Sequence, residues 1–246
     1  DTCHDEGKRD YDFLPTGSYK WNAMKYNHKL SNMSRALADM GTDVLPNIGC
    51  AIIGLAEVEN SKALDDLIAQ PALSARNYQY VHIEGPDRRG IDCALLYNPS
   101  LFSVKSTRLV PYVQKLKKDS AFYTRGFLTV SGTLADENVA VIVCHLPSRF
   151  SESFYRELGA EQVKAIKDSL LNDDPNCKVF VMGDMNDDPI DKSMAGILKG
   201  KGNIKDVNEG DMYNPWYNIL VKEGVGTLLY QGSWNLFDQI LVTPNL

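Results

Sequence analysis

Apolar positions recur along this chain with two different periods, and each period predicts one kind of element. From residue 26 to residue 40 they fall three or four positions apart, which is the spacing of one helix face, and Gly41 follows as a stop signal. Short continuous apolar runs, such as 179–182, are typical of strands buried in a sheet. We predict helices at residues 26–40, near 64–68, over 154–170 and around 194–198, and strands at 50–56, 78–83, 91–97, 102–110, 122–134, 139–145, 179–182 and 236–243.

The order of these elements indicates the fold class. Long series of strands are broken by helices, and the sequence contains no internal repeat, low-complexity tract or linker. A length of 246 residues suits one large domain or two small ones. We predict a single α/β domain over residues 1–246, with mixed sheets packed as a sandwich.

Composition and charge limit the possible partners. With 43% hydrophobic and 24% charged residues the chain is globular, and its net charge of -6 gives no strongly basic surface for nucleic acid. A metal-dependent enzyme can still approach phosphates without a positive surplus. The apolar runs are much too short for a membrane span. No signal peptide is visible, but the chain begins at Asp1 rather than Met, so we expect its true N-terminus to lie elsewhere.

The stretch from Lys178 to Pro189 carries the strongest chemical signal. Gly183 ends the apolar run of a predicted buried strand, and a short polar loop follows with the side chains Asp184, Asn186, Asp187 and Asp188. Acidic side chains at the exit of a buried strand are costly for folding unless they bind something. Asp, Asn and Pro are also common in turns between strands, so the loop alone supports either interpretation.

Three further apolar runs also carry polar residues at their ends. Glu57 follows the run at 50–56, His145 and Arg149 follow the run at 141–144, and Asp238 lies at the start of the last strand. Each has an ordinary explanation: Glu57 could cap a helix, His145 could be a core histidine, and Asp238 could be a surface residue. Four such ends in one chain favour a shared functional site.

Other common sites do not fit the sequence. The five cysteines are an odd number without a C-x-x-C pair, so neither zinc spacing nor a disulfide framework is expected. Residues 184–195 begin like a calcium-binding EF-hand loop, but Pro189 stands where glycine is needed and Ala195 where glutamate is needed. There is no Gly-x-Ser-x-Gly motif, and Cys144 and His145 point to opposite faces of a strand.

With these motifs the chain resembles the endonuclease/exonuclease/phosphatase superfamily. These metal-dependent phosphoesterases include pancreatic-type deoxyribonucleases, abasic-site nucleases and inositol and sphingomyelin phosphodiesterases. The resemblance covers nearly the whole chain and rests on Gly-Asp-x-Asn at 183–186 in this order and context, while segments 85–97 and 145–149 resemble uncharacterised bacterial members of the Bacteroides type. It implies a four-layer α/β sandwich, in which two mixed β-sheets pack face to face and are flanked by helices.

The resemblance also implies a role for each candidate residue. Glu57 would hold the catalytic Mg²⁺, for which Mn²⁺ could substitute. Asp184 would activate or orient the attacking water, and Asn186 would position both Asp184 and the phosphate. His145 would contact a phosphate oxygen, and Asp238 would steady the other catalytic groups. Two arginines are further candidates for phosphate contact, namely Arg89 and Arg149.

Two motifs of the superfamily have no counterpart here. Its members carry an asparagine in a first strand, whereas Trp21-Asn22 is followed by a helical pattern. Its members also end with Ser-Asp-His, whereas no histidine follows His145 in this sequence. We expect that the first strand and the Ser-Asp-His segment lie outside the given sequence, and the alternative is a degenerate, non-catalytic relative. A free sheet edge beside Asp184 would favour the first interpretation.

Three functions therefore compete. The leading hypothesis is a Mg²⁺-dependent phosphodiesterase that acts on DNA or RNA by in-line attack of water. The second keeps this chemistry for a phosphomonoester, a sugar phosphate or a phospholipid head group, which the acidic pI of about 5.3 mildly favours. The third is a non-catalytic phosphate-binding relative. We expect a monomer, and relatives of the bacterial type are often exported from the cytoplasm.

Overall fold

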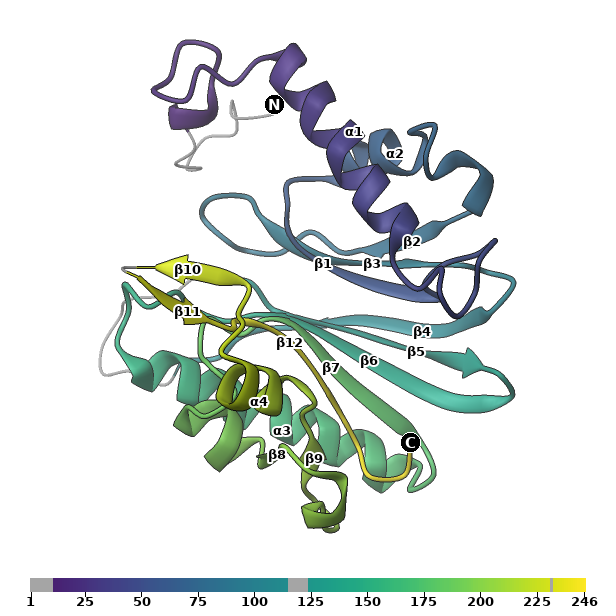
Figure 1. Cartoon of the computed structure of the whole chain (residues 1–246), viewed down its shortest axis with the longest axis vertical. Helices are drawn as coiled ribbons and strands as arrows, with labels where there is room; N and C mark the ends of the chain where they lie inside the picture. Colours follow the sequence, from purple (N-terminus) through teal and green to yellow (C-terminus); the bar gives the residue numbers. More distant parts are fainter. Residues whose placement is uncertain (1–10, 115–123, 231) are drawn as a thin grey trace.

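The protein folds as a four-layer α/β sandwich. The computed structural model describes residues 11–114, 124–230 and 232–246. Two β-sheets pack face to face, with helices α1 (Ala23–Asp39) and α2 (Ser61–Ile68) on the outer face of one sheet and α3 (Ser153–Asp173) on the outer face of the other (Figure 1). The predicted fold class is confirmed.

The smaller sheet has three strands, in the order β1 (Ile52–Val58), β3 (Asp92–Tyr97) and β2 (Gln79–His82). Both pairings are antiparallel. Side chains alternate between its two faces, so that Leu96 packs beneath the helices whereas Leu95 faces the second sheet.

The larger sheet is mixed and has seven strands in the order β4-β5-β6-β7-β12-β9-β8. Strands β6 and β7 run parallel because α3 carries the chain back between them, whereas β5 runs antiparallel to β6 and β12 antiparallel to β7. The strands of this sheet are β4 (Phe102–Val110), β5 (Phe127–Leu134), β6 (Glu137–His145), β7 (Lys178–Asp184), β8 (Gly200–Lys201), β9 (Met212–Tyr213) and β12 (Asp238–Val242).

The core is divided into three layers by the two sheets. On β6, residues 139, 141 and 143 face the smaller sheet, and residues 140, 142 and 144 face α3. His145 faces the same side as residues 139, 141 and 143. Cys144 and His145 therefore point to opposite faces of the strand, as the sequence predicts. Gly54 allows the two sheets to approach closely, because a β-carbon at residue 54 would lie 2.8 Å from Met182 Sδ on β7.

Most predicted elements are present in the structure. The strand predicted at 122–134 begins at Phe127, and positions 122 and 123 lie outside the described residues. The helix predicted near 194–198 is a π-helical turn at Lys192–Ile197. Sequence patterns missed the short strands and turns between residues 200 and 235, which include α4 (Trp216–Asn218), η5 (Ile219–Glu223) and the hairpin of β10 (Leu228–Tyr230) and β11 (Ser233–Asn235).

In the described part of the chain, the smaller sheet has an unpaired edge at β1, near β7. Within the described residues β1 pairs only with β3, and it packs over β6 and β7. The larger sheet continues beyond β7 to β12, where Asp238 and Ile240 are exposed while Gln239 and Leu241 are buried. Asn22 does not contribute a strand here, because it caps α1 by accepting a hydrogen bond from the Lys25 N–H. No helix in the described part of the chain is long and apolar enough to span a membrane.

Candidate active site

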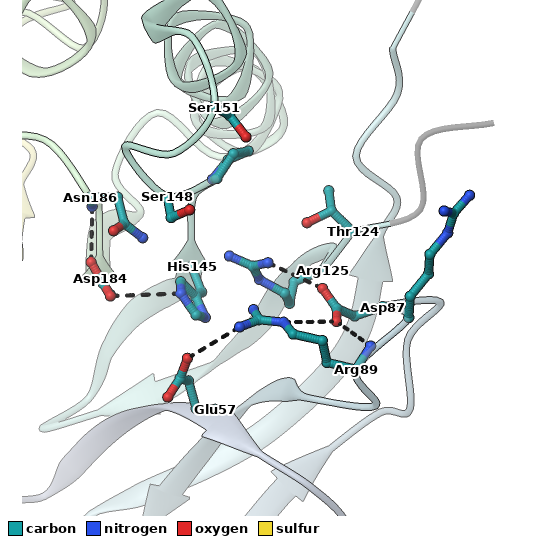
Figure 2. A pocket seen from close by; sticks show the side chains of 12 residues that line it. Glu57, Asp87, Arg89, Thr124, Arg125, His145, Ser148, Ser151, Asp184 and Asn186 are labelled. Atoms are coloured by element: carbon teal, nitrogen blue, oxygen red, sulfur yellow. Dashed lines mark hydrogen bonds and ion pairs between the residues drawn. The ribbon is translucent and has the colours of Figure 1, made fainter. Parts of the chain in front are cut away.

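One polar pocket lies where several strand ends meet. Its volume is about 430 Å³, and it opens between the smaller sheet and the carboxyl ends of β6 and β7 (Figure 2). Four of the predicted catalytic and metal-binding residues line it, together with Arg89. The lining residues are Glu57, Asp87, Arg88, Arg89, Thr124, Arg125, His145, Pro147, Ser148, Ser151, Asp184 and Asn186.

The parallel register of β6 and β7 brings His145 and Asp184 together. They are direct partners across the two strands, and His145 Nε2 lies 3.6 Å from Asp184 Oδ2. Both residues continue the rows of side chains that face the smaller sheet, so both point into the pocket (Figure 2). The sequence pattern predicts each residue at a strand end, and the parallel pairing of the two strands makes them neighbours.

The loop after β7 contains two residues with unusual backbone conformations. Gly183 has φ 133°, and a β-carbon there would lie only 2.0 Å from the Cys144 carbonyl oxygen, so this position requires glycine. Asn186 has φ 50°, and its backbone N–H donates to Asp184 Oδ1 over 2.9 Å. The Asn186 side-chain amide donates to the Leu146 carbonyl over 2.9 Å, which ties this loop to the one after β6.

Glu57 reaches the pocket from the opposite sheet through an irregularity in β1. The pairing of β1 with β3 shifts between Leu55 and Val58, where one additional residue is inserted, and Glu57 has the left-handed φ of 60°. Such a conformation is uncommon for a residue other than glycine. It leaves the Glu57 side chain 62% exposed at the pocket, where its Oε1 lies 3.8 Å from Arg89 NH1.

Burial and neighbouring charges change the protonation of the two central residues. Burial raises the pKa of Asp184 to about 6, the Asn186 N–H opposes this shift, and the negative charges of Asp238 and Glu57 add to it. Burial lowers the pKa of His145 to about 3, and the positive charges of Arg125 and Arg89 act in the same direction. At neutral pH His145 is therefore uncharged and Asp184 is an anion.

Arg125 is a site residue that the sequence analysis missed. Its side chain is only 8% exposed, NH1 donates to Asp87 Oδ2 over 3.1 Å, and NH2 donates to the Leu146 carbonyl over 3.0 Å. The signal used to predict the other site residues is a polar residue at the end of a strand, whereas Arg125 precedes one. Because β5 runs antiparallel to β6, the start of β5 lies at the same sheet edge as the end of β6, so polar residues just before Phe127 also reach the pocket.

Arg149 does not line the pocket, although we predicted a phosphate contact for it. Its Nε donates to the Asn186 carbonyl over 3.1 Å, its NH2 lies 3.0 Å from Asp188 Oδ2 and 2.8 Å from Asp191 Oδ2, and its guanidinium stacks 4.4 Å from the centre of the Phe237 ring. These contacts hold the guanidinium outside the pocket, and the bond to the Asn186 carbonyl lets Arg149 stabilise the loop that carries Asn186.

A second arginine fixes the same loop from α3. Arg156 Nε donates to Asp187 Oδ1 over 2.6 Å, and both side chains are buried. Arg156 NH1 also donates to the carbonyls of Ser148 and Ser151, and Ser193 Oγ donates to Asp187 Oδ2. Asp187, which the sequence placed in the acidic loop, thus has a structural role beside Asn186.

Asp238 completes the acidic side of the site. It is the antiparallel partner of Asp184 on β12, and it is exposed. It lines a second hollow of about 530 Å³ between α1 and β1, which shares Glu57, Arg89 and Asp184 with the first pocket. Among the predicted residues, the structure therefore brings together Glu57, Arg89, His145, Asp184, Asn186 and Asp238, and excludes Arg149.

The chemistry of these groups fits a hard divalent cation. Glu57 is an exposed carboxylate, and Asp184 and Asp238 are close enough to add negative charge to the same region. Among the described residues no group of three or more His, Cys, Asp or Glu side chains is arranged to hold a metal ion. One carboxylate with water and substrate oxygens suffices for Mg²⁺, whereas zinc requires a more complete set of protein ligands.

Comparison with known proteins identifies the class to which this fold and site belong. The chain belongs to the Endonuclease/Exonuclease/phosphatase family, whose model matches residues 1–246. Members of this family are in general divalent-metal-dependent hydrolases of phosphoesters. No curated protein sequence matches the chain significantly.

Solved structures with the same fold include three that differ in what was bound to them. TDP2 from D. rerio, complexed with a single-strand DNA product, has a TM-score of 0.58 at 15% identity over 87% of this chain and 78% of its own. The human Nocturnin catalytic domain, with bound sulfate, has a TM-score of 0.58 at 16% identity over 89% and 75%. ANGEL2, a 2′,3′-cyclic phosphatase in complex with adenosine-2′,3′-vanadate, has a TM-score of 0.62 at 15% identity over 86% and 73%.

Proposed function

We propose that this protein is a Mg²⁺-dependent phosphodiesterase that hydrolyses P–O bonds in nucleic acid by in-line attack of water. The observation that carries the proposal is the convergence of Glu57, His145, Asp184 and Asn186 on one pocket with Arg89 and Arg125. Carboxylates, an uncharged histidine and guanidinium groups are the set that phosphoryl transfer needs, because its catalysis is mainly positioning and charge stabilisation.

Asp184 would orient and activate the attacking water. One of its oxygens accepts the Asn186 N–H, which leaves the other directed towards His145 and the pocket. A pKa of about 6 keeps the carboxylate ionised at neutral pH and makes it a stronger base than an ordinary aspartate. Asn186 would keep this carboxylate in place and offer its amide to the phosphate.

His145 and the arginines would stabilise the charge on the phosphoryl oxygens. An uncharged imidazole still has one N–H to donate, and Nε2 is the ring nitrogen that lies towards Asp184. Arg125 is fixed by Asp87 and by a backbone carbonyl, so its guanidinium is positioned before substrate binds. Glu57 would hold Mg²⁺, which when bound polarises the phosphoryl oxygens and stabilises charge on the leaving oxygen.

A second candidate function is hydrolysis of a small phosphoester, such as a phosphomonoester or a sugar or lipid head-group phosphate. The net charge of -6 and the limited pocket volume of about 430 Å³ favour it. The same fold in ANGEL2 serves a 2′,3′-cyclic phosphatase, so a small substrate is compatible with this architecture.

The test is hydrolysis by the intact gene product in the presence of Mg²⁺. Supercoiled plasmid DNA, RNA and a panel of small phosphoesters would be compared for the wild type, Asp184→Asn and the control Asp173→Asn at the exposed end of α3. We expect nicking of DNA that Asp184→Asn abolishes and Asp173→Asn retains. Hydrolysis of small esters alone would favour the second candidate. No turnover on the whole panel would refute both and leave a non-catalytic phosphate-binding protein.

Among the described residues no strand pairs with the outer edge of β1, and this supports the prediction that a further strand completes the smaller sheet. Such a strand would lie next to Glu57, where it would add side chains to the site. Activity of a longer gene product that exceeds that of residues 1–246 by orders of magnitude would support this proposal. Equal activity of the two would contradict it.

A further inference from the structure

The pocket has two chemically different ends. Glu57 and Asp184 lie at one end, and Arg125 lies at the other with its partner Asp87. Arg89 spans the two ends, because its guanidinium lies 3.8 Å from Glu57 Oε1 and 3.6 Å from Asp87 Oδ1. His145 lies between the two ends (Figure 2). The water-activating groups are all at the acidic end. At the other end the proposed chemistry gives a role to the arginines but none to the hydroxyl groups that also line the pocket.

Three residues with hydroxyl side chains line the same pocket as Arg125. Thr124 is contributed by the segment before β5, and Ser148 and Ser151 by the loop between β6 and α3. In Figure 2 Thr124 lies next to Arg125, whereas Ser148 and Ser151 lie above His145 on the other side of the opening. In the part of the chain that the structure describes, no hydrogen bond to another residue involves any of these three hydroxyls. They are therefore available as donors to a ligand.

Surrounding hydrogen bonds fix the Arg125 end of the pocket. Arg125 is 8% exposed and its Nε has no hydrogen-bond partner, although two other donors of the same guanidinium are bound. Arg156 fixes the Ser148–Ser151 loop by donating to both serine carbonyls. The 21-residue helix α3 begins two residues after Ser151, and its N-cap residue Glu152 makes no side-chain capping hydrogen bond. A helix N-terminus adds a partial positive charge beside the hydroxyls.

A guanidinium with several hydroxyl donors and a helix N-terminus is suited to a phosphate dianion or diester. We propose, on the basis of the phosphoesterase function proposed above, that this end of the pocket binds a second phosphate group of the substrate. The preferred substrate then carries one phosphate at the acidic end, where it is hydrolysed, and another beside Arg125, Thr124, Ser148 and Ser151. This second phosphate could be a terminal monoester of a small molecule or the next phosphodiester of a polymer.

Three matched chromogenic substrates test the proposal in Mg²⁺. They are the p-nitrophenyl ester of thymidine 5′-phosphate with a free 3′-hydroxyl, with a 3′-phosphate, and with a 3′-methyl phosphate diester. We expect kcat/KM for release of nitrophenolate to be about tenfold or more higher with a 3′-phosphate group than with the 3′-hydroxyl. A preference for the monoester would identify a terminal phosphate as the ligand, and an equal gain with the methyl diester would identify a polymer phosphate.

The variants locate this preference on the hydroxyl groups. The preference is the ratio of kcat/KM for the preferred 3′-phosphate substrate to kcat/KM for the 3′-hydroxyl substrate. Ser148→Ala combined with Ser151→Ala should lower this ratio towards one, and Thr124→Val should lower it in part. A matched control, Ser103→Ala combined with Ser106→Ala on the exposed part of β4, should retain it. Circular dichroism of each variant would establish that it is folded.

The possible failures are distinguishable. Equal kcat/KM values for all three substrates in the wild type would overturn the second phosphate site and leave the proposed phosphodiesterase intact. A preference that survives the loss of all three hydroxyls would also overturn it. Absence of nitrophenolate from every substrate would refute the proposed function itself, and the second site with it.

Discussion

Arg156 Nε lies 2.6 Å from Asp187 Oδ1, and each of the two side chains is only 6% exposed. This ion pair joins α3 to the loop that carries Asn186, and it also reaches the carbonyls of the Ser148–Ser151 loop. Both loops line the pocket, so one buried pair supports both of its ends.

We predict that Asp187→Asn destabilises the protein strongly. It leaves the Arg156 charge buried without its partner, a change that typically costs about 3–5 kcal/mol. Chemical denaturation monitored by circular dichroism would measure the free energy of unfolding. The control is Glu157→Gln, which breaks the surface pair with Lys192 and should change stability by less than about 1 kcal/mol. Equal effects of the two substitutions would contradict the importance of the buried pair.

The raised pKa of Asp184 makes the stability of the metal-free protein depend on pH. Its folded pKa of about 6 is above the unfolded value, so the folded state binds more protons between roughly pH 4 and 6. Stability contributed by this group is therefore present at low pH and is lost as the pH rises through 6. We predict that Asp184→Asn becomes more stable than the wild type above pH 6, with the difference disappearing below about pH 4. Denaturation curves from pH 4 to 8 without divalent ions would show it, and a constant difference would refute it.

Arg149 should affect turnover and not substrate affinity. Because it supports the Asn186 carbonyl from behind, we predict that Arg149→Met lowers kcat about tenfold or more with little change in KM. Arg149→Lys should recover part of the loss, since an ammonium group can pair with Asp188 or Asp191 but cannot make the same set of contacts. Steady-state kinetics on the preferred substrate decides the matter. A raised KM with unchanged kcat would instead support the phosphate contact that the sequence suggested.

Gly183→Ala should be among the most damaging small substitutions in the chain. A side chain at φ 133° is strained, and its β-carbon would collide with the Cys144 carbonyl. We predict a loss of stability of about 3 kcal/mol or more, or a displaced Asp184 with low activity. Gly196→Ala is a matched control, because a β-carbon there meets only Lys192 Cγ at 3.4 Å. Thermal unfolding of the two variants would compare them, and similar melting temperatures with full activity in both would disprove the prediction.

The sequence was sufficient to place the strands and their polar ends because both depend on local pattern. The run before Asp184 is apolar enough to specify a buried strand, and Gly183 marks where it ends. The pairing that sets His145 beside Asp184 was accessible only through the family resemblance, because parallel register is determined by tertiary packing.

What the sequence did not reveal depends on contacts between distant segments. The additional residue in β1 that turns Glu57 into the pocket has no local signature, since the left-handed conformation is imposed by pairing with β3. The sequence alone does not distinguish Arg149 from Arg125 as a candidate for phosphate contact. The structure shows that Asp188 and Asp191 pair with Arg149 outside the pocket, whereas Arg125 lines the pocket and pairs with Asp87.

The close approach of Gly54 to Met182 affects how substitutions in the core can alter the site. Glu57 belongs to one sheet, and Asp184 and His145 belong to the other, so these candidate site residues face each other across the interface between the two sheets. The thickness of the packing in that interface sets the span that a substrate must fill. An interior substitution far from the pocket, such as a larger side chain at residue 54, would move the two sheets apart. It would thereby widen the site and change the size of the substrate that fits between its two halves.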